Sequence, residues 1–172
     1  EPLHIGHGCH IDVSDQSKTV LAGTNNKKAI YTGNFHQHVD YNLLTRLASE
    51  NKDVDFILIG PTEPSNISAA AIRQEDLKTL KEQTNVFLLG SVPGEELHKY
   101  LNAATICLVL FKKEYERIHH APHKLMAYFA SGNVILANPM EGYKTVPKDL
   151  MIQVSQEEIP TRFRELSADL AE

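Results

Sequence analysis

Tryptophan is absent from this 172-residue sequence, and cysteine occurs only twice, as Cys9 and Cys107. Cys107 lies within the apolar run 106–111, a setting that argues against a disulfide framework and favours reduced thiols. No apolar run comes near the ~18 residues that a membrane-spanning helix needs, and the chain does not open on a charged and then apolar leader. These absences favour a soluble, cytoplasmic protein.

The sequence also lacks an excess of basic residues, because 17 lysines and arginines stand against 22 aspartates and glutamates, for a formal net charge of -5. A nucleic acid is therefore a poor candidate partner, although a local basic pocket can still hold one small anion. Neither G-x-G-x-x-G nor G-x-x-x-x-G-K-[ST] occurs, which disfavours a dinucleotide dehydrogenase and a P-loop NTPase.

The first residues combine metal-ligating side-chain types with a loop-like composition. The ligating types are His4, His7, Cys9 and His10. A second cluster at zinc-finger spacing is missing, so the sequence predicts no metal site. We interpret residues 1–26 as a linker and entry loop from a missing N-terminal domain, since the chain begins Glu1-Pro2 without a methionine. Residues 27–172 have the size of one ordinary domain.

From residue 27 onward, short apolar runs alternate with helical patterns. The apolar runs predict strands at residues 29–32, 55–60, 86–90, 106–111, 134–137 and 151–154. Helices are predicted after an Asp40 cap and at residues 72–84, 94–104, 122–131 and 160–170. This alternation predicts an α/β fold: a Rossmann-like doubly wound parallel sheet of about six strands with helices on both faces.

Residues 122–139 form the most informative passage, because a short helix, a stop at Gly132 and a buried strand follow one another directly. His119, His120, His123 and Lys124 crowd the predicted helix start, where free N–H groups and the helix dipole favour an anion. In such a sheet, ligands bind beyond the carboxyl ends of the strands, so we expect a phosphate site there. A solvated basic loop is the alternative interpretation.

The order of these pieces resembles a known family. The segments IYTGNF, DFILIGP, GSVPGEEL and PHKLMAYFASG are similar to the C-terminal, donor-binding domain of group 1 glycosyltransferases, which have the two-domain GT-B architecture. The segment GHGCHID also resembles the turn by which the family's chain enters this domain, and this reading replaces most of the case for a metal.

The resemblance implies a nucleotide-diphosphate sugar of the UDP or GDP type as substrate, with no separate cofactor. Gly33 and Asn34 lie where the family's first glycine turn approaches the diphosphate, and Val92 lies where backbone contacts the nucleobase. His123, Lys124 and Leu125 lie at the helix start that faces the phosphates. A helix N-terminus with flanking cations stabilises a diphosphate leaving group without a metal.

The resemblance also implies functions for the part of the protein outside this chain. A missing N-terminal domain would bind the glycan or glycoconjugate acceptor and allow peripheral membrane association, in bacterial polysaccharide assembly. This piece alone is then expected to be inactive. The catalytic residues remain unknown.

The sequence departs from the family in two features. Many members carry two glutamates, the second of which binds the donor ribose, and the corresponding positions here are His119 and Ala127. The basic residue that many relatives place after the first glycine turn is represented only by His38. Two alternatives therefore stay open: a non-catalytic GT-B-like binding or assembly domain, and a sugar-nucleotide epimerase with the same architecture.

Overall fold

The computed structural model describes residues 25–35, 37–61, 74–115 and 123–169. Its centre is one six-stranded sheet in the order β3-β2-β1-β4-β5-β6, with all neighbouring strands parallel. The strands are β1 (Lys27–Thr32), β2 (Val54–Ile59), β3 (Val86–Gly90), β4 (Ile106–Val109), β5 (Val134–Ala137) and β6 (Met151–Gln153). The predicted parallel, doubly wound sheet is confirmed.

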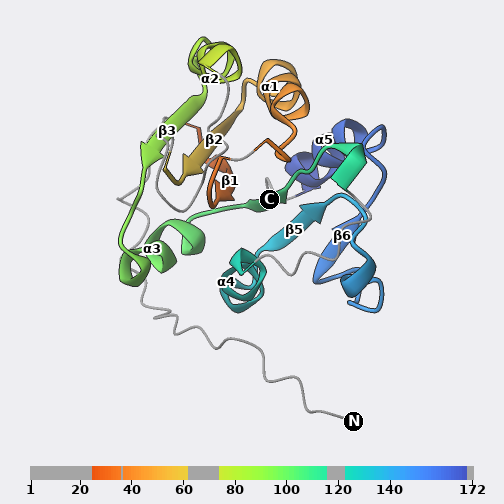
Figure 1. Cartoon of the computed structure of the whole chain (residues 1–172). Coiled ribbons are helices and arrows are strands. Elements are labelled where there is room, and N and C mark those ends of the chain that lie inside the picture. Colours follow the sequence, from red (N-terminus) through yellow and green to blue (C-terminus); the bar gives the residue numbers. More distant parts are fainter. Residues whose placement is uncertain (1–24, 36, 62–73, 116–122, 170–172) are drawn as a thin grey trace.

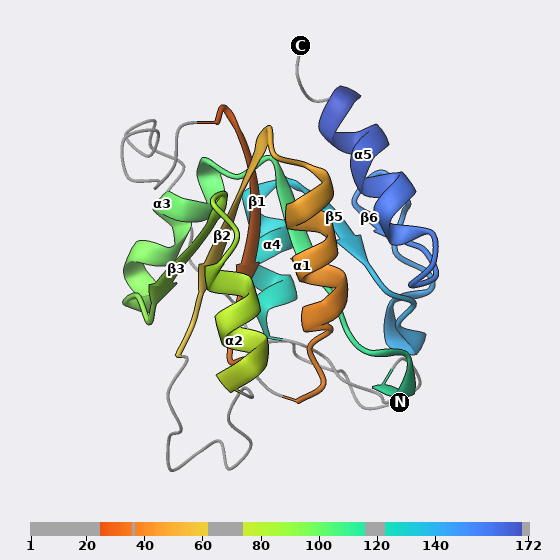
Figure 2. The ribbon, with the colours of Figure 1, turned by 90° about the horizontal axis from the view of Figure 1, so that it is seen from above.

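Helices cover both faces of this sheet. They are α1 (Tyr41–Glu50), α2 (Gln74–Lys81), α3 (Leu97–Asn102), α4 (Lys124–Ser131) and α5 (Ile159–Asp169), with short 3-10 turns at Gly94–Glu96, Lys113–Tyr115 and Glu141–Tyr143. Figure 1 shows α1, α2 and α5 on one side of the strands and α3 and α4 on the other, and Figure 2 shows α1 and α5 in front of the sheet. None of the helices in the described ranges is long and apolar enough to cross a membrane.

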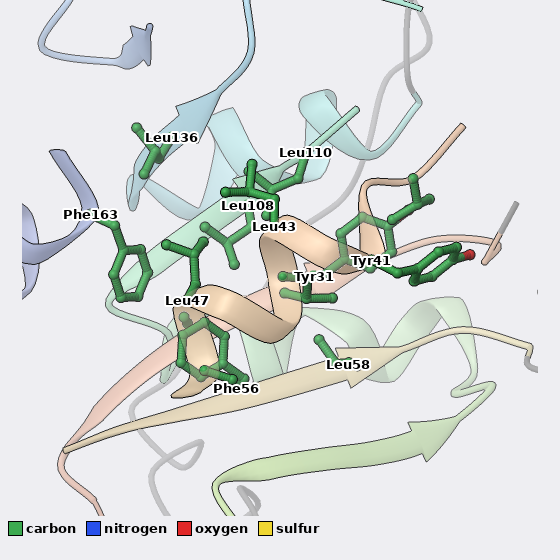
Figure 3. Close-up of a cluster of buried hydrophobic side chains, with 14 of the residues drawn as sticks. Tyr31, Tyr41, Leu43, Leu47, Phe56, Leu58, Leu108, Leu110, Leu136 and Phe163 are labelled. Carbon is green, nitrogen blue, oxygen red and sulfur yellow. The ribbon is translucent and has the colours of Figure 1, made fainter. Parts of the chain in front are cut away.

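Alternate strand residues supply two separate cores, as the two-residue period of a sheet covered on both faces requires. On the α1 face, Phe56 stacks on Phe163 of α5 with ring centroids 5.4 Å apart, beside Leu47 and Leu108 (Figure 3). On the α4 face, Ile30 and Cys107 pack against helices α3 and α4. Cys107 is buried and free, whereas Cys9 lies outside the described residues, so the reduced state expected from the sequence stays a prediction.

The largest correction to the predicted elements concerns residues 94–104. The structure divides the single predicted helix into a 3-10 turn, Gly94–Glu96, and the six-residue helix α3. Gly94 follows Pro93 and no side chain caps the turn, so the first turn winds tightly before α3 begins. The predicted start at Pro122 lies outside the described residues, as do residues 1–24, His119 and His120.

Strands β1, β2 and β3 each lead into a glycine with positive φ, at Gly33 (121°), Gly60 (152°) and Gly90 (70°). Gly33 N–H donates to the Ile59 carbonyl at 2.9 Å, and Gly60 N–H donates to the Gly90 carbonyl at 2.8 Å. The chain therefore turns away from three neighbouring strands at the same edge of the sheet. This is the carboxyl edge at which ligands bind in open α/β sheets.

Candidate functional site

A cavity of about 370 Å³ opens at this carboxyl edge, within the range of about 300–1,000 Å³ that is usual for ligand pockets. Its polar wall is formed by Thr32 and Gly33 from the end of β1 and by His123 and Lys124 from the start of α4. It lies beside the junction of β1 and β4, where the strand order reverses direction. Parallel topology thus brings together segments about ninety residues apart in the sequence.

The rest of the described lining is mainly apolar. It includes Ile59, Val92, Leu97 and Ala127, and Ser91 adds a hydroxyl after β3. The described wall carries two basic side chains and no carboxylate. Its chemistry suits an elongated ligand with an anionic end near α4 and a flat or apolar part near Val92 and Leu97.

Close backbone contact shapes the floor of the cavity at Gly60. A Cβ added to Gly60 would lie 2.0 Å from the Gly33 carbonyl oxygen and 2.8 Å from its carbon. The two glycine turns therefore touch with no room for a side chain between them. By contrast, a Cβ on Gly33 would meet the Lys124 side chain at 3.9 Å, an ordinary van der Waals contact, so the positive φ of 121° and not a lack of space favours glycine there.

Lys124 places its ammonium against aromatic rings at the cavity wall. Its Nζ lies 3.7 Å from the centroid of the Tyr31 ring and 5.7 Å from that of Phe111. No ion pair joins it to a carboxylate in the described ranges. Burial lowers the pKa of the Lys124 ammonium to about 7, because the charged form loses water and gains only the ring faces in return. An anionic ligand would supply the missing counter-charge.

The predicted site residues do not all reach the cavity. Gly33, Val92, His123, Lys124 and Ala127 line it. His119 and His120 lie outside the described residues, so their predicted role is not tested.

Asn34 and Leu125 contribute no side chain to the described cavity wall. Asn34 is exposed, and its carbonyl accepts from the Tyr31 hydroxyl at 3.3 Å. The Leu125 side chain is fully buried in the α4-face core. Any contact of Leu125 with a ligand is therefore limited to its backbone.

Two neighbouring polar groups contribute nothing to the described cavity wall. Asn138 is fully buried, and its side-chain oxygen accepts from the Phe111 N–H at 2.7 Å. His38 packs edge-on against Phe111 and Tyr115, with centroids 5.6 and 5.7 Å away, and is not among the described lining residues. No cluster of three metal-ligating side chains occurs in the described part of the chain.

Sequence reasoning missed the polar contribution of Thr32 and the apolar contribution of Leu97. Helical spacing within residues 94–104 places Leu97 on an apolar stripe, and the structure leaves its side chain half-buried at the start of α3, where it lines the cavity. The sequence pattern places Thr32 in a strand, and only the following glycine, Gly33, indicates that the chain bends there.

No protein-family model and no curated protein matches the sequence. Solved structures do match the fold. Sucrose-phosphate synthase from Thermosynechococcus elongatus is similar over 85% of this chain and 37% of its own, with a TM-score of 0.65 and 18% identity. HepE from Anabaena, in complex with UDP-glucose, is similar over 84% of this chain and 40% of the HepE chain, with a TM-score of 0.61 and 14% identity.

The apo-form glycosyltransferase GlyE from Streptococcus pneumoniae is similar over 86% of this chain and 34% of its own, with a TM-score of 0.60 and 12% identity. This chain thus spans less than half the length of each of these proteins. At these identities the similarity establishes the fold alone: the chain is a Rossmann-like α/β domain of the kind found in GT-B glycosyltransferases.

Proposed function

We propose that this chain is the donor-binding half of a glycosyltransferase and holds a nucleotide-diphosphate sugar of the UDP or GDP type in the cavity described above. The observation that carries the proposal is Lys124, a half-buried cation whose ammonium lies over the Tyr31 ring and has no carboxylate partner in the described ranges, at the wall of a cavity on the switch-point edge of the sheet. The diphosphate would lie between Lys124, His123 and the Gly33 turn. The base would lie against Val92 and Leu97.

The rest of the reaction belongs to the remainder of the protein. A second, N-terminal domain would bind a glycan or glycoconjugate acceptor and close over the donor, and bacterial polysaccharide assembly is the setting that we propose. The nucleotide sugar is the substrate, and no separate cofactor is proposed. Because the reacting groups would come together between two domains, the 172-residue chain alone is expected to bind donor without transferring sugar.

Titration of the ¹⁵N-labelled chain with UDP, GDP and inorganic pyrophosphate tests the proposal. We expect saturable amide shifts at Gly33, Val92, Lys124 and Ala127 with either nucleotide, and smaller shifts near Val92 with pyrophosphate, which has no base. Absence of shifts at millimolar nucleotide, or shifts confined to another surface, would reject it.

The principal alternative is a GT-B-like domain that has lost donor binding and acts in assembly. It rests on Ala127, the cavity residue at the position where many relatives carry the ribose-binding glutamate. An epimerase is a weaker candidate, since the described cavity wall has no acidic side chain to move a proton.

The Ala127→Glu variant separates the first two functions. Ala127 is half-buried and lines the cavity, so a carboxylate there can accept hydrogen bonds from ribose hydroxyls. A hydrogen bond to a charged group contributes about 1.5–3 kcal/mol, and UDP should therefore bind roughly ten- to a hundredfold more tightly. Isothermal titration calorimetry measures the gain.

A 2′,3′-dideoxy nucleotide is the matched control, because it lacks the hydroxyls and should gain little affinity. Ala127→Gln, which has the same shape without the charge, should gain less than Ala127→Glu. A lower melting temperature without any gain in affinity would instead favour the assembly domain, since the new carboxylate would then be buried without a partner.

A further inference from the structure

The ladder between β1 and β4 breaks off just before the cavity. These two strands share only two residue pairs, Ala29 with Ile106 and Ile30 with Cys107, whereas β1 and β2 share six. Continuing the register would place Thr32 opposite Val109. In a parallel ladder the Thr32 N–H would then donate to the Leu108 carbonyl, one residue before that partner.

A tyrosine hydroxyl from α4 occupies the place of that missing hydrogen bond. The Thr32 N–H donates to Tyr128 Oη at 2.8 Å, and Tyr128 Oη lies 3.4 Å from the Leu108 carbonyl oxygen, to which it donates. The Thr32 hydroxyl also reaches Tyr128 Oη, at 3.3 Å. Tyr128 is fully buried. One phenol oxygen is thus inserted between the two strands at the point where they diverge.

The lysine of the site lies near the same divergence of β1 and β4. Lys124 and Tyr128 are four residues apart on α4 and therefore lie on one face of the helix. Lys124 Nζ lies over Tyr31 of β1 and approaches Phe111, which follows β4. Both side chains therefore contact the end of β1 where it separates from β4: Tyr128 Oη meets the Thr32 N–H, and Lys124 Nζ meets the Tyr31 ring.

We propose that Tyr128 is a positioning residue for the cavity: its hydroxyl, inserted into the broken β1–β4 ladder, holds open the gap that seats Lys124 against the Gly33 turn. Without the oxygen, Thr32 and Leu108 either bond directly, which narrows the gap, or lose their partner, which frees the end of β1. Both outcomes move Gly33 relative to Lys124. The ligand part of this inference rests on the proposed function.

The Tyr128→Phe variant removes that single oxygen. We expect UDP affinity to fall about tenfold, and the titration midpoint of the Lys124 side chain, followed by its ¹³Cε shift without ligand, to move from its wild-type value. Tyr143→Phe is the control: it removes one oxygen from a half-buried tyrosine whose ring contacts Phe129 of α4. It should change neither quantity, even if both variants lose the same stability in urea.

These two measurements separate the inference from the proposed function. If wild type binds no nucleotide, the proposed function fails, and the Lys124 titration in Tyr128→Phe alone decides the inference. An unchanged Lys124 midpoint, or unchanged UDP affinity in a variant of a binding-competent protein, overturns it. Hydrogen exchange of the wild-type Thr32 amide needs no variant: protection equal to that of Ile30 is expected, and exchange as fast as an exposed amide overturns the inference.

Discussion

Lys124→Met is expected to weaken UDP binding by roughly ten- to a hundredfold without lowering the stability of the domain. The loss in affinity corresponds to one hydrogen bond to a charged group, about 1.5–3 kcal/mol. Methionine has a similar length and can keep the packing on Tyr31, while it removes a charge that burial disfavours. Calorimetric titration and urea unfolding measure the two quantities.

The same lysine predicts the sign of a pH dependence. Burial holds the pKa of the free Lys124 ammonium at about 7, below its ordinary 10.5, and a bound diphosphate would raise it again. Below about pH 7 the charge is already present and affinity is highest. Above it, binding must take up a proton, so affinity should fall by up to about tenfold per pH unit. Lys124→Met should lose this slope.

The stability of the unliganded domain should respond to pH in the opposite direction. Between about pH 7 and 10.5 the unfolded chain binds the lysine proton more strongly than the folded one, so this group's contribution favours folding increasingly as the pH rises.

The matched control for Lys124→Met is Lys78→Met, which changes an exposed lysine on α2 in the other helical layer. It should leave UDP affinity and its pH dependence unchanged. Equal UDP affinity in Lys124→Met and wild type would contradict the diphosphate role.

Gly60→Ala is expected to destabilise the domain by about 3–5 kcal/mol, at the high end for a single substitution. The new Cβ would lie 2.0 Å from the Gly33 carbonyl oxygen, and the backbone φ of 152° already disfavours any side chain. Relief requires the Gly33 turn to move, and this turn forms part of the cavity wall. Urea unfolding and UDP titration should therefore both register the change.

Two other glycines provide a graded control. Gly90 has a φ of 70° but open space around its Cβ position, so Gly90→Ala should cost only about 1–2 kcal/mol. Gly142 has neither constraint, and Gly142→Ala should be nearly neutral. If all three variants were equally stable, the contact between the Gly33 and Gly60 turns could not be as close as described.

Local sequence patterns predicted the sheet, its parallel connections and the edge that carries the cavity, because apolar runs and glycine stops are encoded by neighbouring residues. Lys124 was found in the same way, from its place at a helix start. The lowered pKa of Lys124 could not be predicted from the sequence, because it depends on the contact of the ammonium with Tyr31, a residue distant in sequence.

Tyr128 shows the same limit more sharply. Helical spacing from Leu125 places Phe129 on the apolar face of α4, whereas the fully buried residues are Leu125 and Tyr128. Nothing adjacent to Tyr128 signals that its hydroxyl meets Thr32, 96 residues earlier. Similarly, no pattern around Asn138 shows that its amide is engaged by the Phe111 N–H.

The short β1–β4 ladder divides the sheet along a seam that coincides with the order of synthesis. Strands β1 to β3 come from the first part of the described chain and β4 to β6 from the second, and β1 and β4 share two pairs across the seam. The ribosome therefore releases one complete half-sheet before the other, and α5, the last helix, closes over the first half where Phe163 stacks on Phe56. A ligand bound between Gly33, which follows β1, and Lys124, which follows β4, would contact both half-sheets and stabilise their association.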